Sequence, residues 1–164
     1  MAAKEKTLGD LFLETLKDTY SAEKQILRAL SKMEKFAQSE QLADAFQKHR
    51  GETEEQIDRL EQVFELLEKP PRAKMCQATQ GIIEEATEVA QEFKGSEALD
   101  AGIIAAAQAV EHYEIARYGS LKSWAAQLGM NEVVKLLDAT LQEEKKTDSL
   151  LTQLAEQQAN KEAA

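Results

Sequence analysis

The sequence is poor in cysteine, proline and glycine, and each shortage excludes a class of structure. Its 164 residues include one cysteine, two prolines and seven glycines. The lone Cys76 excludes an internal disulfide and any zinc or redox motif built from paired cysteines. So few turn-forming residues leave little room for the many turns of an all-β fold, and they favour long helices.

A long apolar run and an excess of positive charge are also missing. No stretch approaches the ~20 apolar residues of a membrane-spanning helix. The charged residues 1–6 are not followed by an apolar segment of the signal-peptide type, so we expect a cytoplasmic protein with no membrane partner. The net charge of −10, from 30 acidic and 20 basic residues, excludes nucleic acid as an expected partner because the phosphate backbone would be repelled.

Five segments carry apolar residues at helical spacing, three or four residues apart. The expected helices cover residues 8–37, 39–68, 81–93, 97–128 and 131–158, with breaks at Pro70-Pro71, Gly95 and Gly129. Short links join the first two long helices and the last two, while the longer middle connection can cross the length of a bundle. The sequence therefore predicts one all-α domain over residues 1–164, a four-helix bundle with one crossover that contains a short extra helix. An open helical array is the alternative, but no repeat of about 30–45 residues supports it.

Polar residues interrupt all four long apolar stripes. In the last helix, Glu144 and Asp148 take two successive stripe positions, and Glu111 and Glu114 do the same in the helix before it. The stripe of the first helix contains Tyr20 and Glu23, and that of the second contains His49, Thr53 and Gln56, with Glu52 at its edge. Two acidic residues in one core stripe are unusual, and their presence in several helices needs a common explanation.

The acidic residues of neighbouring helices are predicted to lie at the same height along the bundle. Counted from the link between their helices, Glu23 and Glu52 come level, and Glu114 and Glu144 form a second such pair. A buried carboxylate costs several kcal/mol unless it is paired or coordinated. Metal ions would neutralise the cluster: carboxylates with an imidazole suit iron or manganese, and all-oxygen sites can also hold Mg²⁺ or Ca²⁺. The alternative is a polar seam in which the acids are hydrogen-bonded to tyrosine, histidine and water.

Four segments carry a resemblance to a known family. Residues 20–25 (YSAEKQ), 49–56 (HRGETEEQ), 110–116 (VEHYEIA) and 141–148 (LQEEKKTD) resemble the YciE/YciF family of ferritin-like bacterial stress proteins, more closely its YciF branch. The resemblance covers about residues 7–155 and extends distantly to rubrerythrin-type di-iron proteins. It implies a ferritin-like bundle, a small oligomer such as a homodimer, and a carboxylate di-metal centre.

The resemblance also assigns residues. It implies two ions of iron or manganese, with the metal ligands Glu23, Glu52, Glu111, Glu114, Glu144 and Asp148, and with His49, Gln56, Tyr20 and Tyr118 as further ligands or as neighbours of the ligands. The E-x-x-H histidines of the wider di-iron pattern are missing, because position 55 is Glu and position 147 is Thr. Gln56 and Asp148 stand nearest to the expected places. No catalytic residue is assigned.

Three functions follow as hypotheses. The first is a ferritin-like stress-response protein whose di-metal centre carries out ferroxidase, peroxide or oxygen chemistry. The second is a non-enzymatic, dimeric helical stress protein whose polar core is a vestigial metal site. The third, an iron-storage cage, ranks last because the resemblance implies a small oligomer.

Overall fold

The computed structural model describes residues 5–164, so the first four residues of the predicted domain lie outside the described part. Its elements are α1 (Leu8–Phe36), α2 (Glu40–Leu66), α3 (Gln77–Glu92), α4 (Leu99–Gln127) and α5 (Asn131–Leu154), followed by a π-helical turn (Ala155–Ala159) and α6 (Asn160–Glu162). Residues 5–164 contain no β-strand, as predicted. In the same range, no helix is both long and apolar enough to cross a membrane.

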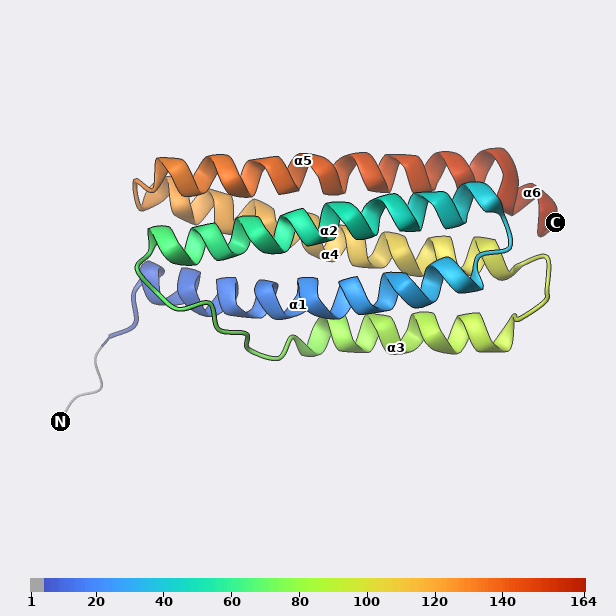
Figure 1. The fold of residues 1–164 in the computed structure, drawn as a ribbon, viewed down its shortest axis with the longest axis horizontal. Helices are drawn as coiled ribbons and strands as arrows, with labels where there is room; N and C mark the ends of the chain where they lie inside the picture. The colour runs from blue at the N-terminus through green and yellow to red at the C-terminus, as the bar shows by residue number, and fades with distance from the viewer. Residues whose placement is uncertain (1–4) are drawn as a thin grey trace.

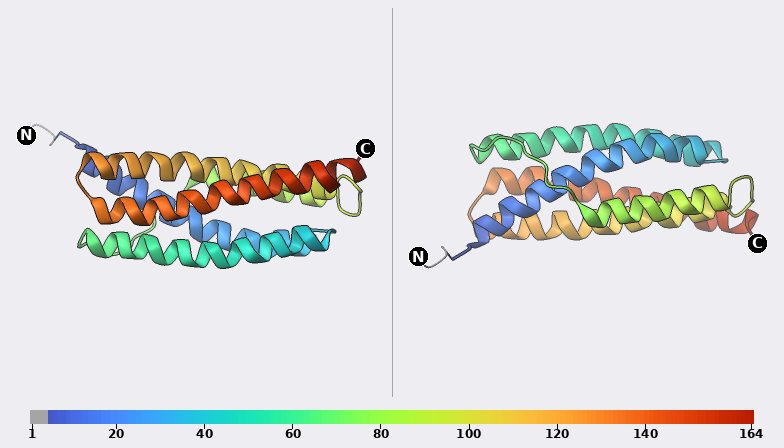
Figure 2. Two further views of the ribbon diagram at one scale, coloured as in Figure 1. Left: turned by 90° about the horizontal axis from the view of Figure 1, so that it is seen from above. Right: turned by 90° about the horizontal axis from the view of Figure 1, so that it is seen from below.

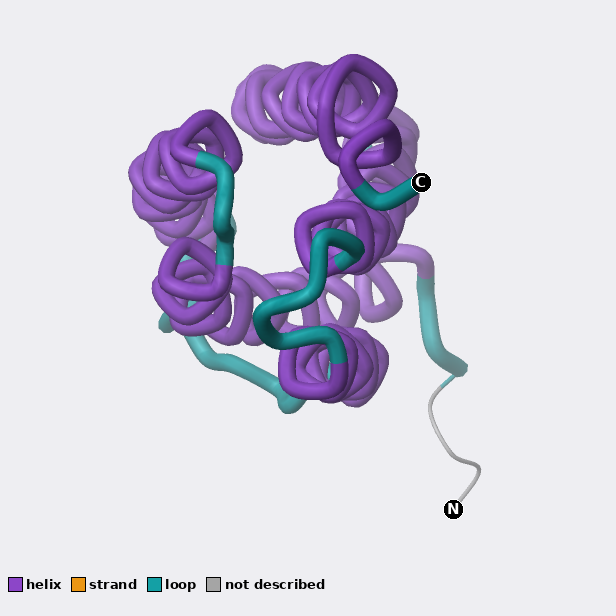
Figure 3. Tube along the Cα trace, turned by 90° about the vertical axis from the view of Figure 1, so that its right-hand side faces the viewer, coloured by secondary structure: helices purple, strands orange, loops and turns teal. Residues whose placement is uncertain are grey.

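Four long helices lie side by side, and α3 is an addition to them (Figure 1). Helices α1 and α2 are antiparallel neighbours, as are α4 and α5, whereas α2 and α4 run in the same direction. The connection that contains α3 makes this possible because it returns the chain to the opposite end of the bundle. Helix α3 packs outside the four-helix arrangement, against α1 and α4 (Figures 2 and 3). The predicted ferritin-like bundle with one crossover is confirmed.

The ends of the helices follow local hydrogen bonds. At the start of α1, the Thr7 hydroxyl accepts from the Asp10 backbone N–H at 3.2 Å, and the Asp10 carboxylate accepts from the Thr7 N–H at 2.8 Å. This is the capping box that stabilises a helix N-terminus. Helix α3 begins at Gln77, earlier than the predicted residue 81, because the Cys76 thiol caps it by accepting from the Thr79 N–H at 3.5 Å.

The link between α1 and α2 is held by a residue of another helix. The backbone N–H groups of Gln38 and Ser39 donate to the Asp100 carboxylate at 2.9 and 2.8 Å. Ser39 is the N-cap residue of α2, but its own side chain makes no capping bond. At the far end of the chain, the α-helix ends at Leu154 instead of residue 158, since the π-helical turn replaces its last part.

The interior consists of two apolar clusters with polar residues between them. We call them the Phe12 cluster, which includes Leu16, Leu60, Leu121 and Leu141, and the Ile26 cluster, which includes Leu30, Phe46, Ile104 and Leu151. The side chains that separate them are all buried, and we call them the polar layer: Glu23, His49, Thr53, Gln56, Glu111, Glu114 and Glu144. Each long helix thus contributes to both apolar clusters and to the layer between them.

Candidate metal centre

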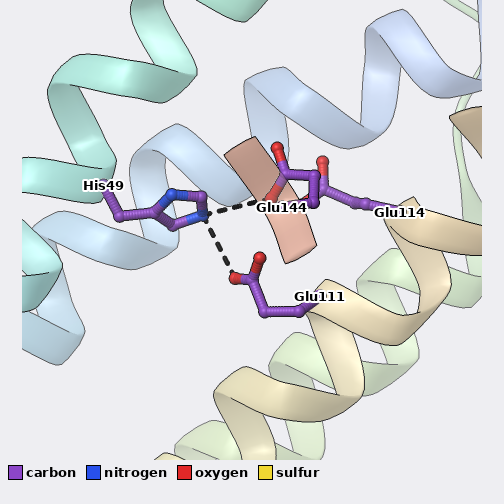
Figure 4. A group of neighbouring side chains, drawn as sticks. All are labelled: His49, Glu111, Glu114 and Glu144. Carbon is purple, nitrogen blue, oxygen red and sulfur yellow. Dashed lines mark ion pairs between the residues drawn. The ribbon is translucent and has the colours of Figure 1, made fainter. Parts of the chain in front are cut away.

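Three helices bring four potential ligands together in the polar layer. His49 comes from α2, Glu111 and Glu114 from the middle of α4, and Glu144 from α5 (Figure 4). One ligand atom of each lies within 4.8 Å of the others, and all four residues are buried. Glu111 and Glu114 point into the same space because residues three apart share a helix face.

The imidazole of His49 is oriented by contacts on both of its nitrogens. Its Nε2 lies 3.1 Å from Glu111 Oε1 and 3.8 Å from Glu144 Oε2 (Figure 4). Its Nδ1 lies 3.6 Å from Glu52 Oε2 and 3.5 Å from Thr147 Oγ1. A histidine ligand usually has its second nitrogen fixed in this way by a carboxylate or another polar group. Nε2 is therefore the nitrogen that faces the carboxylates.

The first helix contributes Glu23, which is fully buried. The Tyr118 hydroxyl of α4 donates a hydrogen bond to Glu23 Oε1. Burial raises the pKa of Glu23 to about 7, although the hydrogen bond from Tyr118 acts in the opposite direction. The phenol of Tyr118 is itself buried beside Glu23 and Glu114, and burial followed by these two charges holds its pKa well above the ordinary value. Near neutral pH, Glu23 can therefore hold or release a proton.

Mutual repulsion adds to burial for the remaining acids. Burial raises the pKa of Glu114 well above its usual range, and the nearby Glu144 and Glu23 raise it further. Burial also raises the pKa of Glu144, and its contact with Glu111 adds to the shift. Burial alone would lower the pKa of His49, but the charge of Glu111 and the other carboxylates around the ring holds it well above the ordinary value. A cation between these groups would reverse the shifts of the acids.

The unpaired oxygens fit a metal ion. Within residues 5–164, six buried carboxylate oxygens have no hydrogen-bond partner: one each of Glu23 and Glu111, and both of Glu114 and Glu144. A buried acceptor without a partner is costly, so these oxygens need water or a cation. Several carboxylates with one imidazole form a donor set that suits iron or manganese. The residues present therefore fit the predicted metals.

Two basic side chains of the helices that carry Glu23 and Glu114 are engaged with aromatic rings. The Lys24 ammonium lies 4.1 Å from the centre of the Tyr20 ring, and the Arg117 guanidinium lies 5.0 Å from that of Tyr113. Both make cation–π contacts, so neither is placed among the buried carboxylates. The negative charge of the polar layer is thus balanced within the described residues chiefly by His49 and by protonation.

Two of the predicted site residues lie with other partners. Asp148 is partly exposed, and its Oδ1 lies 3.1 Å from Gln108 Nε2 and 3.2 Å from His112 Nε2. The Tyr20 hydroxyl donates to Glu61 at 2.6 Å. Neither belongs to the group of four ligands, so the structure does not bring them together with it.

Two other predicted residues border the group. Glu52 is 26% exposed, and its Oε1 lies 3.4 Å from the Lys48 ammonium, while its second oxygen faces His49. Gln56 is fully buried, and its amide donates to Glu143 at 3.1 Å. Glu52 is therefore the predicted ligand that connects the polar layer with the solvent.

Sequence reasoning missed the ion pair that supports Gln56. Arg59 donates from Nη1 and Nη2 to the two carboxylate oxygens of Glu143 at 2.6 and 2.7 Å. Two features of the sequence could have indicated this ion pair. Gln56 and Arg59 are three residues apart and share a face of α2, and Glu143 is next to the stripe residue Glu144. Thr147, which contacts His49, was also not predicted.

Comparisons with known proteins agree on one family. The family described as a domain of unknown function, DUF892, matches residues 7–164. The protein YciF of Escherichia coli strain K12 is 50% identical over 159 residues, which cover 96% of each chain. The crystal structure of the E. coli stress protein YciF has a TM-score of 0.91 at 49% identity, and the match covers 96% of this chain and 99% of that one. YcfI from Rhodopseudomonas palustris, described as a candidate structural protein, has a TM-score of 0.88 at 45% identity, over 93% and 97% of the two chains. The chain therefore belongs to the DUF892 family.

Proposed function

We propose that this member of the DUF892 family binds two iron or manganese ions in its polar layer and uses them for oxidation chemistry. The observation that supports the proposal is the set of six unpaired carboxylate oxygens around His49. Four such acids in one dry layer destabilise a protein that has no cation to place among them. The same arrangement is suited to a protein whose ligands must be ready before the ions arrive.

The ligands divide between two ions. His49, Glu111, Glu114 and Glu144 form the group that would hold the first. Glu23 and Glu52 lie on its borders and would help to hold a second ion. Asp148 is not in this set, because Gln108 and His112 occupy its carboxylate.

The chemistry can be written as a balanced reaction. Two iron(II) ions would each lose one electron, and dioxygen would accept these two electrons with two protons and leave as hydrogen peroxide. A cation beside Glu23 would lower the pKa of that carboxyl, so the Tyr118 hydroxyl, which donates to Glu23, is the group of this chain that holds a proton next to the ions. The E. coli relative is described as a stress protein, and we propose that this chain acts under stress by removing iron(II) or an oxidant.

A metal titration tests the proposal. Metal-free protein is titrated anaerobically with iron(II) or manganese(II) and then desalted. The bound metal is measured by elemental mass spectrometry. We expect about two ions per chain for the wild type and a loss of at least one for Glu144→Gln. The matched control is Glu54→Gln, which removes the same charge from an exposed position of α2 and should bind as the wild type does.

A different result would favour the non-enzymatic hypothesis. If the wild type retains no more metal than Glu144→Gln, the polar layer is a hydrogen-bonded seam, and a structural role of the kind described for YcfI becomes the better account. The homodimer implied by the resemblance stays a prediction, and sedimentation equilibrium of the wild type checks it.

A further inference from the structure

A small apolar cavity lies directly against the candidate metal centre. Its volume is about 30 Å³, and it is lined by residues of α1, α3 and α4 and by Phe46 of α2. Every lining residue is apolar except Glu111. The Oε1 atom of Glu111 lies 3.1 Å from Nε2 of His49. The cavity therefore ends on one of the proposed ligands.

The outer end of the cavity meets a groove on the surface. This groove runs between α1 and α3, has a volume of about 510 Å³, and is lined in part by the polar side chains of Gln25, Arg28 and Glu84. Ala29 of α1 and Ile83 of α3 line both the groove and the cavity. Both are half-buried, so they form the boundary between solvent and the apolar interior. The groove and the cavity thus adjoin at Ala29 and Ile83, and Glu111 is among the residues that line the cavity.

Small side chains and the close packing of α3 create this space. Ala86, Ala106 and Ala107 line the cavity, and alanine leaves room where a larger side chain would fill it. Helix α3 itself is firmly placed on α4: a Cβ added to Gly102 would lie only 2.7 Å from Val89 Cγ1. The gap is therefore bounded by packed helices and does not depend on a loop.

The apolar residues that line the cavity determine which small molecules can occupy it. An apolar cavity stays dry, because water placed there would lose its hydrogen bonds. Hydrogen peroxide and hydrated metal ions are excluded for the same reason. Dioxygen is apolar and small enough for a space of this size.

We propose that the apolar cavity between α1, α3 and α4 is a dioxygen site and conducts dioxygen from the α1–α3 groove to Glu111. The inference rests on the proposed function, which it deepens by naming dioxygen, and not peroxide, as the oxidant that this route supplies. Ala29 and Ile83 form its narrow entrance.

Nuclear magnetic resonance of the metal-free protein detects the site without any reaction. Dissolved dioxygen is paramagnetic and increases the relaxation of nearby methyl groups. Under raised oxygen pressure, we expect the methyls of Ile26 and Leu30, two buried residues that line the cavity, to relax several-fold faster than those of Leu121 and Leu137. The latter are equally deep in the Phe12 cluster and serve as the internal control. Equal relaxation in both regions overturns the proposal.

Two variants change the entrance in opposite directions. Ala29→Leu narrows it and should lower the rate of iron(II) oxidation by dioxygen about tenfold, a barrier change of ~1.4 kcal/mol, while Ile83→Ala should raise that rate. Oxidation by hydrogen peroxide should stay unchanged in both. The control is Ala109→Leu. Ala109 is an exposed residue of α4 that lines neither the cavity nor the groove, so this variant should behave as the wild type.

The outcomes separate this inference from the proposed function. If metal binds but Ala29→Leu oxidises iron(II) at the wild-type rate, the path is wrong and the metal centre stands. If the dioxygen and peroxide rates fall together, the variant has damaged the centre, and the path is again overturned. If the wild type binds no metal but dioxygen increases the relaxation at Ile26, the proposed function fails and the dioxygen site stands.

Discussion

The polar layer and the Phe12 cluster are buried to the same degree but have opposite energetic consequences. Leu16 and Leu121 in the cluster have no exposed surface, and neither do Glu23 and Glu144 in the layer. Burying a leucine side chain stabilises the fold by about 1.5–3 kcal/mol. Burying a carboxylate without a partner destabilises it. Burial alone therefore does not reveal what a residue contributes to stability.

This contrast separates the fold from its proposed function. The two apolar clusters provide the stability, and the layer between them reduces it in the metal-free protein. A cluster of aligned ligands that lowers the stability of the metal-free protein is typical of a binding site. Binding of the metal raises the stability again by mass action. The predictions below test this contrast, beginning with the largest expected effect.

Leu121→Ala should lower the free energy of unfolding by about 2–5 kcal/mol, because it leaves a cavity in the Phe12 cluster. The increase in stability on adding metal should stay the same as in the wild type, since the polar layer is not touched. Urea unfolding with and without manganese(II) measures both quantities. A variant that loses the metal-dependent increase would show that the two regions are not separate.

Glu144→Gln should have the opposite effect on the metal-free protein. It keeps the shape of the side chain and removes a buried charge, so we expect the free energy of unfolding to stay the same or to rise by ~1–3 kcal/mol. In the presence of metal, the variant should lose the stabilisation that the wild type gains. Thermal unfolding of both proteins, with and without anaerobic iron(II), provides the four values needed. A large destabilisation of the metal-free variant would contradict our account of the layer.

The stability of the metal-free protein should fall as the pH rises. The pKa of Glu23 is about 7 in the folded chain, above its ordinary value of 4.5, so its contribution is present at low pH and is lost as the pH rises through 7. The raised pKa of His49 acts in the same direction. Between pH 5 and 8, the free energy of unfolding should decrease by about 1–3 kcal/mol. Urea unfolding across this range checks the sign, and a flat or rising profile would contradict it.

Asp148→Asn should have the smallest effect. Its carboxylate contacts Gln108 and His112 and not the group of four ligands, so the affinity for metal should change less than about threefold, below ~0.7 kcal/mol. Isothermal titration with manganese(II) measures the affinity, and Glu114→Gln gives the contrasting loss. If Asp148→Asn removes one ion, the original assignment of Asp148 as a ligand is correct.

The sequence was sufficient for the fold because its signals are local. Helical spacing and the breaks at Pro70-Pro71 and Gly129 are each recognised within a few residues, and together they predict the order and direction of the helices. The early start of α3 was missed because a thiol cap at Cys76 is not a strong signal.

The site was only partly predictable, since side-chain direction at the edge of a stripe depends on neighbouring helices. Glu111, Glu114 and Glu144 lie in the centre of their stripes, and the structure brings them together. Glu52 lies at the edge of its stripe, beside Lys48. Asp148 takes a stripe position in the sequence, but its side chain is partly exposed and contacts His112. No single sequence reveals such contacts between helices.

Anomalous diffraction at the iron or manganese absorption edge is the most direct test of the metal centre. Crystals are grown from protein that was loaded anaerobically and washed free of excess metal. We expect one anomalous peak among His49, Glu111, Glu114 and Glu144, and a second beside Glu23 and Glu52. A map without a peak in the polar layer, from protein that carries metal elsewhere or not at all, would contradict the account.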